Sequence, residues 1–429
     1  MKNPSSSQSP RRTTRRGFLK GAAAGAALAA TAPSARLYAR ILGANDRIRI
    51  GVVGPGGMGT GHVVAFSNFG ASGRAPVEIV AVSDVAVPHM ERAKGEIQKR
   101  MEGVEVGMHQ DYRELLARQD VDGIVNATPE HWHANIAVDA VAAGKDVYNE
   151  KPLCMTLDDA FRVQEAVEGS DRVFQVGTQK MALAKYRAAR DLIAEGAIGK
   201  PLWSQTGYCR NTPSGEWNYY GIEKDLKPGV NLDWKTWCGP KGERPWDPKV
   251  YHRWRRYRDF STGIIGDLLV HQMTPMMYAL DADFPTKVFC AGEHMVDLDM
   301  ENHDQVLLTV GFPDGHTMVV AGNTNNEQGF TDMIRGQKGT LYLGGKDCEL
   351  RPERPFADDV EPQVVECPQV HDQDELRLNW LQSMQTRETP FSPVQFAVKV
   401  MVIVDLATRS AWDGRAYAFD PETRKVTAL

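Results

Sequence analysis

A glycine-rich stretch near residue 55 offers the clearest chemistry in the sequence. It reads Gly-Pro-Gly-Gly-Met-Gly and fits the pattern G-x-G-x-x-G, with the residues Gly54, Gly56, Gly57, Met58 and Gly59. In such a turn the first glycine permits a tight bend, the second lets the backbone approach a pyrophosphate, and the third lets the next helix close onto the strand. The N-terminus of that helix then faces the phosphates. The stretch predicts a dinucleotide-binding turn, and a purely structural glycine turn is the alternative.

An acidic residue ends the next apolar run. Residues 76–84 read PVEIVAVSD, which is typical of a buried strand ending at Asp84. An aspartate at this place binds the two hydroxyls of an adenosine ribose and repels a 2′-phosphate. Asp84 lies 28 residues beyond Gly56, and the loop GASGRAP explains why this exceeds the usual spacing of about 20. We therefore expect NAD as the cofactor, with NADP as the alternative.

Two side chains suited to proton transfer lie four positions apart in the apolar segment IIGDLLVHQMTPMMYAL. They are Asp267 and His271, and this spacing places both on one face of a helix. Imidazole titrates near neutrality, so His271 suits a general base. Asp267 would orient that imidazole or bind a substrate hydroxyl. A weak surface pair on a helix is the alternative.

The elements that must position these residues alternate between strand and helix patterns. Strands are expected at 47–54, 76–84, 121–129 and 146–153, and helices at 58–69 and 131–144. Such alternation predicts a doubly wound parallel sheet, with its ligand crevice at the carboxyl ends of the strands. The residues expected in that crevice are Asn126, Thr128, Pro129, His131, Glu150 and Lys151. A strand at 173–181 would bring Gln179 toward the nicotinamide side.

The second half of the chain has a different pattern. Strands are expected at 286–291, 304–312, 315–323, 331–335 and 339–343, with a hairpin turn at 313–315, a loop over 352–370 and helices at 372–386 and 394–412. We expect a dinucleotide-binding domain over 46–170 and a substrate-binding and oligomerisation domain over 171–429.

An aromatic excursion, residues 207–262, interrupts this second domain. It contains Trp217, Trp234, Trp237, Trp246 and Trp254, and ends in the run YHRWRRYRDFSTG. Aromatic faces stack on sugars, and arginine donates to hydroxyls or carboxylates. The candidate substrate residues are Trp254, Arg255 and Tyr257. The alternative is that the aromatic side chains only anchor the excursion to the domain.

The first 40 residues differ in composition from the rest. Arg15 and Arg16 precede the residues Phe-Leu-Lys, and an Ala- and Gly-rich run follows over 21–32. This order is typical of a twin-arginine signal peptide, and the run is shorter than the ~20 residues of a membrane span. We expect residues 1–40 to engage the twin-arginine export machinery, which moves folded proteins, and so to place the protein in the periplasm. A disordered basic tail is the alternative.

Charge and cysteine spacing exclude two classes of function. Residues 1–40 hold eight Lys or Arg and no Asp or Glu, so the rest of the chain has 42 basic and 55 acidic residues. An acidic chain is a poor nucleic-acid binder. No two of the six cysteines have CxxC spacing, and His131 and His133 diverge on a helix, so we expect no metal site.

Five stretches together resemble the glucose–fructose oxidoreductase, inositol dehydrogenase and MocA-type (Gfo/Idh/MocA) oxidoreductases. They are VVGPGGMG, NATPEHWHANIA, EKPLCMTLDDA, FQVGTQ and GIIGDLLVHQ. The resemblance covers the chain from about residue 46 to the end. It implies an α/β fold, with a Rossmann domain followed by a C-terminal α/β domain on a large, open, mostly antiparallel sheet that commonly pairs subunits. It also implies a nicotinamide cofactor and a sugar, polyol or cyclitol substrate.

The resemblance also implies roles for three residues. Lys151, in the Glu-Lys-Pro motif, would lie beside the nicotinamide and the substrate, and Asp267 and His271 would lie against the substrate. Lys151 would then bind the reacting oxygen, and His271 would take its proton.

Three functions remain open on the sequence. The first is an exported oxidoreductase that holds NAD tightly, because no soluble NAD pool outside the cytoplasm would reoxidise it, and that works as a homo-oligomer, dimer or tetramer. The second is a redox-neutral glycosidase that oxidises a ring hydroxyl, eliminates the aglycone and returns the hydride, with Tyr257 or His271 as further acid or base. The third is a non-catalytic sugar-binding protein on the same fold. The intact set of Lys151, Asp267 and His271 favours the first.

Overall fold

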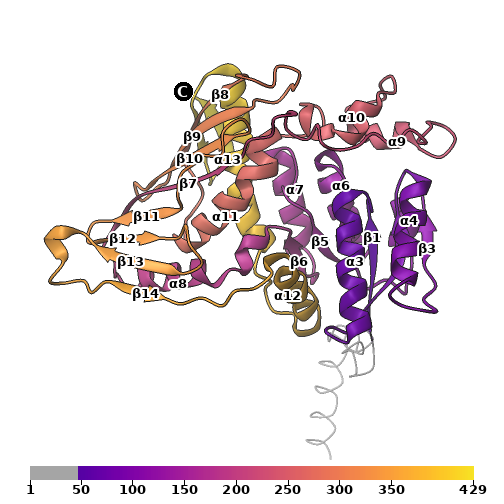
Figure 1. The fold of residues 1–429 in the computed structure, drawn as a ribbon, viewed down its shortest axis with the longest axis horizontal. Helices are drawn as coiled ribbons and strands as arrows, with labels where there is room; N and C mark the ends of the chain where they lie inside the picture. Colours follow the sequence, from indigo (N-terminus) through magenta and orange to yellow (C-terminus); the bar gives the residue numbers. More distant parts are fainter. Residues whose placement is uncertain (1–46) are drawn as a thin grey trace, which may run out of the picture. The chain divides into compact units, whose positions relative to one another are not determined.

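The computed structural model describes residues 47–429, and the expected signal peptide at 1–40 lies outside them. The first sheet is parallel, with six strands in the order β3-β2-β1-β4-β5-β6 (Figure 1). Along the chain these strands are β1 (Ile48–Val53), β2 (Val77–Ser83), β3 (Gly107–His109), β4 (Gly123–Asn126), β5 (Asp146–Asn149) and β6 (Phe174–Val176). The predicted Rossmann domain is confirmed.

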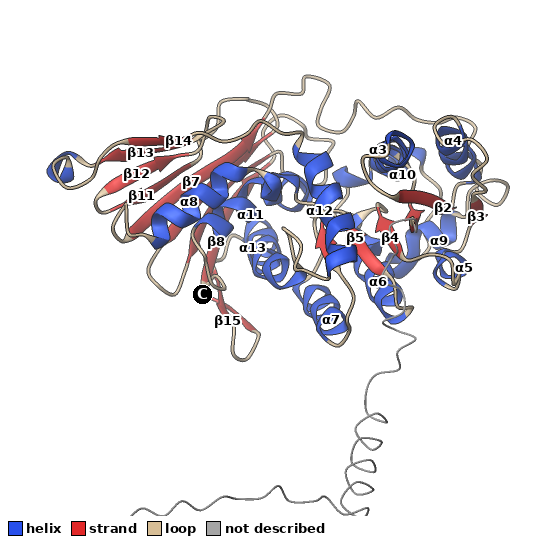
Figure 2. Ribbon diagram, turned by 90° about the horizontal axis from the view of Figure 1, so that it is seen from below, coloured by secondary structure: helices blue, strands red, loops and turns tan. Residues whose placement is uncertain are grey.

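Helices cover both faces of this sheet. They are α3 (Gly57–Ser72), α4 (Val87–Gln98), α5 (Tyr112–Leu116), α6 (Glu130–Ala142) and α7 (Leu157–Glu168). Figure 2 shows α3 and α4 on one face and α5, α6 and α7 on the other. The central strands are buried on both sides, which explains why β1 and β2 read as continuous Val- and Ile-rich runs.

The second sheet has ten strands in the order β14-β13-β12-β11-β7-β10-β9-β8-β15-β16. Its neighbours are antiparallel except for β7 and β10, which run parallel. The strands are β7 (Pro201–Cys209), β8 (Lys287–Glu293), β9 (Gln305–Gly311), β10 (Thr317–Asn323), β11 (Met333–Gly336), β12 (Gly339–Tyr342), β13 (Cys348–Pro352), β14 (Gln363–Val365), β15 (Tyr417–Asp420) and β16 (Lys425–Ala428). The expected hairpin joins β9 to β10.

One face of the second sheet is covered and the other is open. The helices α8 (Ala184–Ala194), α11 (Val270–Ala279) and α13 (Val394–Asp413) pack on the covered face (Figure 2). Strands β8 and β9 accordingly alternate between buried and exposed positions. Large apolar side chains also stand on the open face, among them Trp203, Phe289 and Leu307.

The boundary between the domains differs from the expected one at 170. Strand β6 completes the parallel sheet rather than opening the second domain. The late helix α12 (Asp372–Thr386) also packs on the first sheet, where Trp380 contacts Phe66 and Tyr148 edge-on at ring distances of 5.9 and 5.8 Å. The first domain therefore takes part of its core from residues near the C-terminus.

The expected helix over 264–280 is also different. It begins with a π-helical turn, Ile265–Leu269, and continues as α11. The hydrogen bonds of a π turn close from i to i+5, so Asp267 and His271, four residues apart, still lie toward one side of the helix. The expected loop over 352–370 contains the short strand β14, paired with β13.

The aromatic excursion forms its own small core. It includes the short helices α9 (Trp234–Cys238) and α10 (Pro248–His252). Its buried residues pack around Ala86, which follows β2; they are Leu226, Leu232, Trp234, Trp237, Cys238, Val250, Tyr251 and Phe260. Trp217 instead lies in the main core. All five tryptophans therefore serve at least partly as anchors, with Trp246 and Trp254 packed at the margin of the small core.

Within residues 47–429, no helix has both the length and the apolar character that crossing a membrane requires.

Replacing Trp380 with Ala tests the contribution of α12 to the first domain. The ring is fully buried between Phe66 and Tyr148, so its loss should lower the free energy of unfolding by about 3–5 kcal/mol. Chemical denaturation measures this change. Leu429→Ala, at an exposed position, is the control and should change the free energy by less than about 0.5 kcal/mol. A loss below about 1 kcal/mol in Trp380→Ala would contradict this packing.

Candidate functional site

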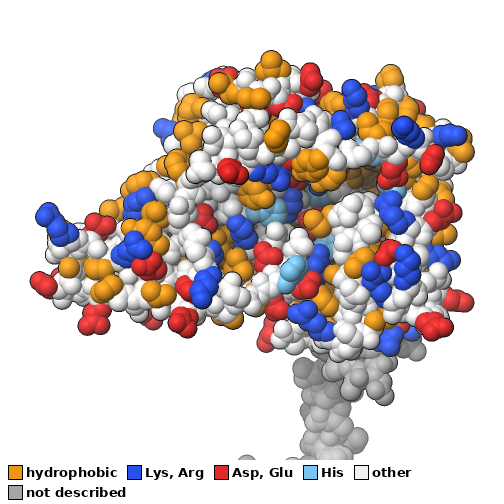
Figure 3. Space-filling model, in the orientation of Figure 1, with side chains coloured by type: hydrophobic (Ala, Val, Ile, Leu, Met, Phe, Trp, Pro, Cys, Tyr) orange, Lys and Arg blue, Asp and Glu red, His pale blue; other side chains and the backbone are white. Residues whose placement is uncertain are grey.

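A cavity of about 870 Å³ lies at the carboxyl ends of the parallel strands. Residues of the glycine turn and of the loops after β2, β4 and β5 line one side, and the aromatic excursion lines the other. Figure 3 shows a hollow on this face of the molecule with histidine and cationic side chains gathered in it. Of the predicted residues, the cavity wall includes Gly54, Gly56, Gly57, Met58, Asp84, Thr128, Pro129, Glu150, Lys151, Trp254 and Arg255.

The glycine turn has the geometry that a pyrophosphate site requires. Gly54 has a φ of +79°, which favours glycine, and a Cβ on Gly59 would lie 2.1 Å from the carbonyl oxygen of Gly54. A Cβ on Gly56 or Gly57 would meet nothing within 4 Å. Helix α3 has no side-chain cap at Gly56, so its first N–H groups are free to bind phosphate oxygens. These residues fit a dinucleotide.

Asp84 lies in the cavity wall with its carboxylate partly engaged. Oδ1 accepts a hydrogen bond from the backbone N–H of Ala86 at 2.8 Å, and Oδ2 lies 3.4 Å from Nδ1 of His89. Burial alone would lower the pKa of His89, but Asp84 and Glu223 together raise it. The carboxylate is thus fixed at the end of β2, where ribose hydroxyls would approach it.

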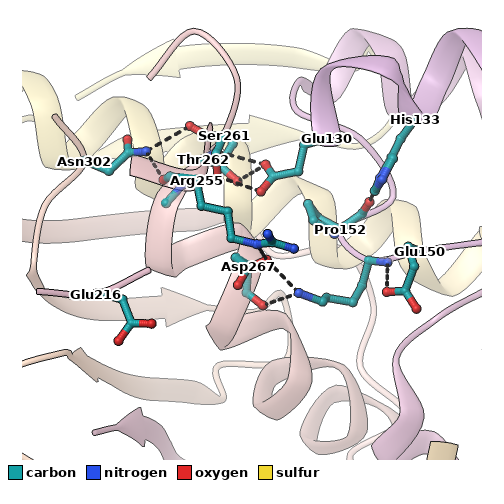
Figure 4. Close-up of polar contacts among 12 residues, drawn as sticks. Glu130, His133, Glu150, Pro152, Glu216, Arg255, Ser261, Thr262, Asp267 and Asn302 are labelled. Carbon is teal, nitrogen blue, oxygen red and sulfur yellow. Dashed lines mark hydrogen bonds and ion pairs between the residues drawn. The ribbon is translucent and has the colours of Figure 1, made fainter. Parts of the chain in front are cut away.

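Lys151 and Arg255 converge on Asp267 (Figure 4). Nζ of Lys151 donates to Oδ1 of Asp267 and to its backbone oxygen, both at 2.8 Å. Nε of Arg255 donates to the same Oδ1 at 2.7 Å. Lys151 follows β5, whereas Asp267 lies in the π turn of the second domain. The contact thus joins a lysine of the first domain to an aspartate of the second, a pairing that the sequence did not predict.

The electrostatics of this cluster favour the ionised aspartate. Burial alone would raise the pKa of Asp267, but the charges of Arg255 and Lys151 outweigh it and hold the pKa well below its usual range. The carboxylate of Asp267 is therefore an anion that holds the ammonium group of Lys151 in position.

His271 lies close to this cluster but is not bonded to Asp267. Its Nδ1 is buried without a hydrogen-bond partner among the described residues. Burial, together with the charge of Lys151, lowers the pKa of His271 to about 3. The expectation that this imidazole titrates near neutrality is wrong, because a buried cationic ring beside a lysine is unfavourable.

Glu150 is held by a chain of polar contacts from α12. Nε of Arg377 donates to Nδ1 of His62 at 3.0 Å, and Nε2 of His62 lies 2.8 Å from Oε1 of Glu150. Because Nδ1 accepts from the arginine, the ring must donate through Nε2. Burial alone would raise the pKa of Glu150, but the contacts with His62 and Lys151 outweigh burial, so the pKa is lower than its usual value. No sequence pattern indicates this contact, since 315 positions separate His62 from Arg377.

Six predicted residues besides Gly59 do not line the cavity: Asn126, His131, Gln179, Tyr257, Asp267 and His271. Asn126 is buried, and its amide bonds Asn149 at 2.7 Å and the backbone of His133. His131 points into the aromatic core, with Nε2 2.8 Å from the carbonyl oxygen of Trp237. Tyr257 packs on the core of the excursion. Gly59 also lies outside the wall, as its role in packing requires.

His133 lines the cavity in place of His131, and Glu130 supports the site from behind. The Glu130 carboxylate accepts hydrogen bonds from the Ser261 hydroxyl and from the backbone and hydroxyl of Thr262, at 2.7 to 3.0 Å. Burial, with Asp267 nearby, raises the pKa of Glu130 to about 7. An acidic residue at the first position of a helix is a signal that could have drawn attention to Glu130.

In residues 47–429, no three His, Cys, Asp or Glu side chains are grouped so as to hold a metal ion.

Comparison with known families agrees with this geometry. Residues 48–178 match the model described as "Oxidoreductase family, NAD-binding Rossmann fold", and residues 183–428 match "Oxidoreductase family, C-terminal alpha/beta domain". The chain belongs to the Gfo/Idh/MocA oxidoreductase family. The resemblance inferred from the five stretches is confirmed, as are the fold class and an NAD-binding Rossmann domain.

Two curated relatives of this Gfo/Idh/MocA chain carry glycosidase names. "Glycosyl hydrolase family 109 protein 1" of Shewanella sp. (strain ANA-3) is 24% identical over 349 residues, which are 76% of this chain and 73% of the relative. "Alpha-N-acetylgalactosaminidase" of Shewanella oneidensis is 24% identical over 308 residues, or 68% of this chain. The chain spans 62% of the length of that second relative.

Solved Gfo/Idh/MocA structures share the fold at lower identity. A levoglucosan dehydrogenase in complex with NADH and levoglucosan is 18% identical, with a TM-score of 0.65 over 90% of this chain and 100% of that chain. The WlbA dehydrogenase from Bordetella pertussis, in complex with NADH and UDP-GlcNAcA, is 17% identical, with a TM-score of 0.65 over 87% of this chain and 99% of that chain.

A Gly59→Ala substitution should impair the dinucleotide turn. The added Cβ would overlap the carbonyl oxygen of Gly54, so helix α3 must move away from β1. We expect about 1–3 kcal/mol of destabilisation and at least about tenfold weaker NAD binding, measured by denaturation and calorimetry. Gly95→Ala, in helix α4 with open space around its Cβ, is the matched control and should be neutral or slightly stabilising. Unchanged NAD affinity in Gly59→Ala would contradict this role.

His271 should remain neutral across the physiological range. With a pKa near 3 in the folded protein and about 6.5 in the unfolded chain, it lowers stability as pH falls from about 6.5 toward 3. NMR of the imidazole nitrogens, assigned with His271→Asn, should show no titration of this ring between pH 5 and 8. A midpoint near 6.5 would show that the ring is solvated.

Proposed function

We propose that this protein is an NAD-dependent oxidoreductase that removes a hydride from the carbon bearing a secondary hydroxyl of a sugar or cyclitol. The observation that carries the proposal is the placement of Lys151. Its ammonium group is fixed on Asp267 at the wall of the same cavity that the dinucleotide turn opens into. A cation in that place has a catalytic use, because alcohol oxidation builds negative charge on the reacting oxygen.

The side chains of this chain have separate parts in the reaction. NAD, when bound, supplies a hydride acceptor. Lys151 donates a hydrogen bond to the reacting oxygen and stabilises the negative charge that develops on it. Asp267 keeps the ammonium group in position and ionised. His271 is unprotonated at neutral pH, which is the state that a proton acceptor needs. It lies close enough to Lys151 for the lysine charge to lower its pKa.

The aromatic excursion supports the further proposal that NAD is held tightly. Its backbone pairs with the segment after β2, through Val87 N–H to Asn231 oxygen and Asp233 N–H to Val85 oxygen, both at 2.9 Å. Trp237 accepts hydrogen bonds at its backbone oxygen from Trp132, in α6. A cofactor in the cavity would lie between the Rossmann strands and this cover, so its release would require the cover to open.

The redox-neutral glycosidase is the second candidate, and the names of the two Shewanella relatives favour it. It would begin with the same oxidation of a ring hydroxyl at Lys151. The neighbouring C–H, made acidic by the new carbonyl, would then lose its proton as the aglycone leaves. Water would add to the resulting double bond, and the hydride would return to the carbonyl carbon. NADP remains possible in either reaction, although Asp84 at the ribose end favours NAD.

We also propose that the protein is exported in folded form with its nucleotide and assembles as a homo-oligomer. The twin-arginine pattern of residues 1–40 supports export. The apolar side chains on the open face of the second sheet, Trp203, Phe289 and Leu307, support assembly through that face.

One experiment tests the chemistry. Protein purified in native form should release NAD or NADH on denaturation. In a separate assay on the native protein, aldoses and cyclitols should reduce the bound cofactor, and the absorbance of reduced nicotinamide measures this reaction. Release of an aglycone from aryl glycosides without net reduction would instead favour the glycosidase. Protein that neither holds nor binds a nicotinamide cofactor would refute both candidates.

Lys151→Met should lower kcat by about 10²- to 10⁴-fold, because the reacting oxygen loses its cation. NAD affinity should change little. Lys346→Met, at an exposed position, is the control and should retain full activity. Full activity in Lys151→Met would remove Lys151 from the reaction.

A further inference from the structure

Arg255 enters the cavity with four of its five N–H donors without a partner among the described residues. Its Nε is bonded to Asp267, and its side chain is about one-fifth exposed. No described residue accepts a hydrogen bond from its two terminal nitrogens. These nitrogens form one edge of the planar guanidinium, and that edge matches the two oxygens of a carboxylate.

Neighbouring side chains fix the plane of this guanidinium. Its central carbon lies 4.1 Å from the centre of the Trp254 ring and 5.8 Å from that of Tyr220. All three residues line the cavity. The Nε bond to Asp267 and the stacking on Trp254 hold the group in one orientation, so little side-chain entropy is lost when a ligand binds its free edge.

The carboxylates near Arg255 leave its free edge open. Lys151 and Arg255 are both cationic, and they share Oδ1 of Asp267. The Glu150 carboxylate, next to Lys151, is held by His62 and by the backbone N–H of Lys151. The Glu130 carboxylate is occupied by Ser261 and Thr262. No carboxylate of the described residues therefore competes with a ligand for the terminal nitrogens of Arg255.

We propose that the substrate is a sugar or cyclitol that carries a carboxylate, and that the free edge of Arg255 binds this group. The inference rests on the proposed function, since it concerns the molecule whose hydroxyl meets Lys151. Arg255 and Lys151 contact the same oxygen of Asp267, so the carboxylate and the reacting hydroxyl would be held on neighbouring donors. Arg255 is then the residue that determines specificity for the acidic substrate.

Matched pairs of sugars test this assignment on the intact, NAD-loaded protein. D-Glucuronate is compared with D-glucose and D-galacturonate with D-galactose, both in NAD reduction and in calorimetric binding. We expect kcat/KM and affinity to be about 10- to 100-fold higher for the acid of each pair, because a bidentate contact to a charged group is strong. Glucose 6-phosphate is a third arm, and a preference for it over both uronates would overturn the carboxylate assignment.

Variants separate the edge contact from a general effect of charge. Arg255→Lys keeps the cation but loses the fork, and Arg255→Gln loses both, so each should lose the preference mainly through a higher KM for the acid. Arg253→Gln is the matched control, because Arg253 bonds Asn218 and Tyr220 and does not line the cavity. It should keep the preference.

The outcomes distinguish this inference from the proposed function. Equal use of acid and neutral sugars, or a preference that survives in Arg255→Gln, would overturn the role of Arg255 while leaving the oxidoreductase intact. If no sugar reduces the cofactor, the proposed function fails. The calorimetric comparison then decides alone, and tighter uronate binding that is lost in Arg255→Gln but kept in Arg253→Gln would still support the carboxylate site.

Discussion

A buried contact between cation and carboxylate joins the two domains where their surfaces meet in the cavity. Lys151 comes from the loop after β5 and Asp267 from the π turn of the second domain, and each is less than one-tenth exposed at its side chain. A buried charge that loses its partner is costly, by about 3–5 kcal/mol, so the two sheets are constrained to keep this distance. The cavity and the orientation of Arg255 depend on that constraint, because Arg255 is held by the same carboxylate oxygen.

The parts of the fold that the sequence predicts are those with local causes. The glycine turn, the strands β1, β2, β4 and β5, and the hairpin between β9 and β10 follow from periodicity and from residues with restricted backbone preferences. Short edge strands such as β3 and β14 are different, since three residues carry too little periodicity and pair only because a neighbouring strand is already in place. The assignment of β6 to the first sheet likewise depends on its pairing with β5.

The same distinction between local and long-range causes applies to the candidate site. Motif positions in the glycine turn and in Glu-Lys-Pro lie in the cavity wall as predicted. The failures concern side-chain direction and burial. His131 lies in the first turn of α6, at the expected edge of the sheet, but its ring packs against Trp237 and Phe260 rather than facing the cavity. The weak basicity of His271 arises from burial and from Lys151, which lies 120 positions away in the chain, so no local pattern could have indicated it.

Helix α12 lies late in the chain but completes the core of the first domain, so the order of synthesis affects when that domain can fold. Trp380 completes the packing around Phe66 and Tyr148, and Arg377 supplies the contact that reaches Glu150 through His62. The nucleotide domain therefore stays incomplete until α12 has been synthesised. The glycine turn emerges long before the support beneath Glu150, so stable capture of the nucleotide must wait for α12 to pack.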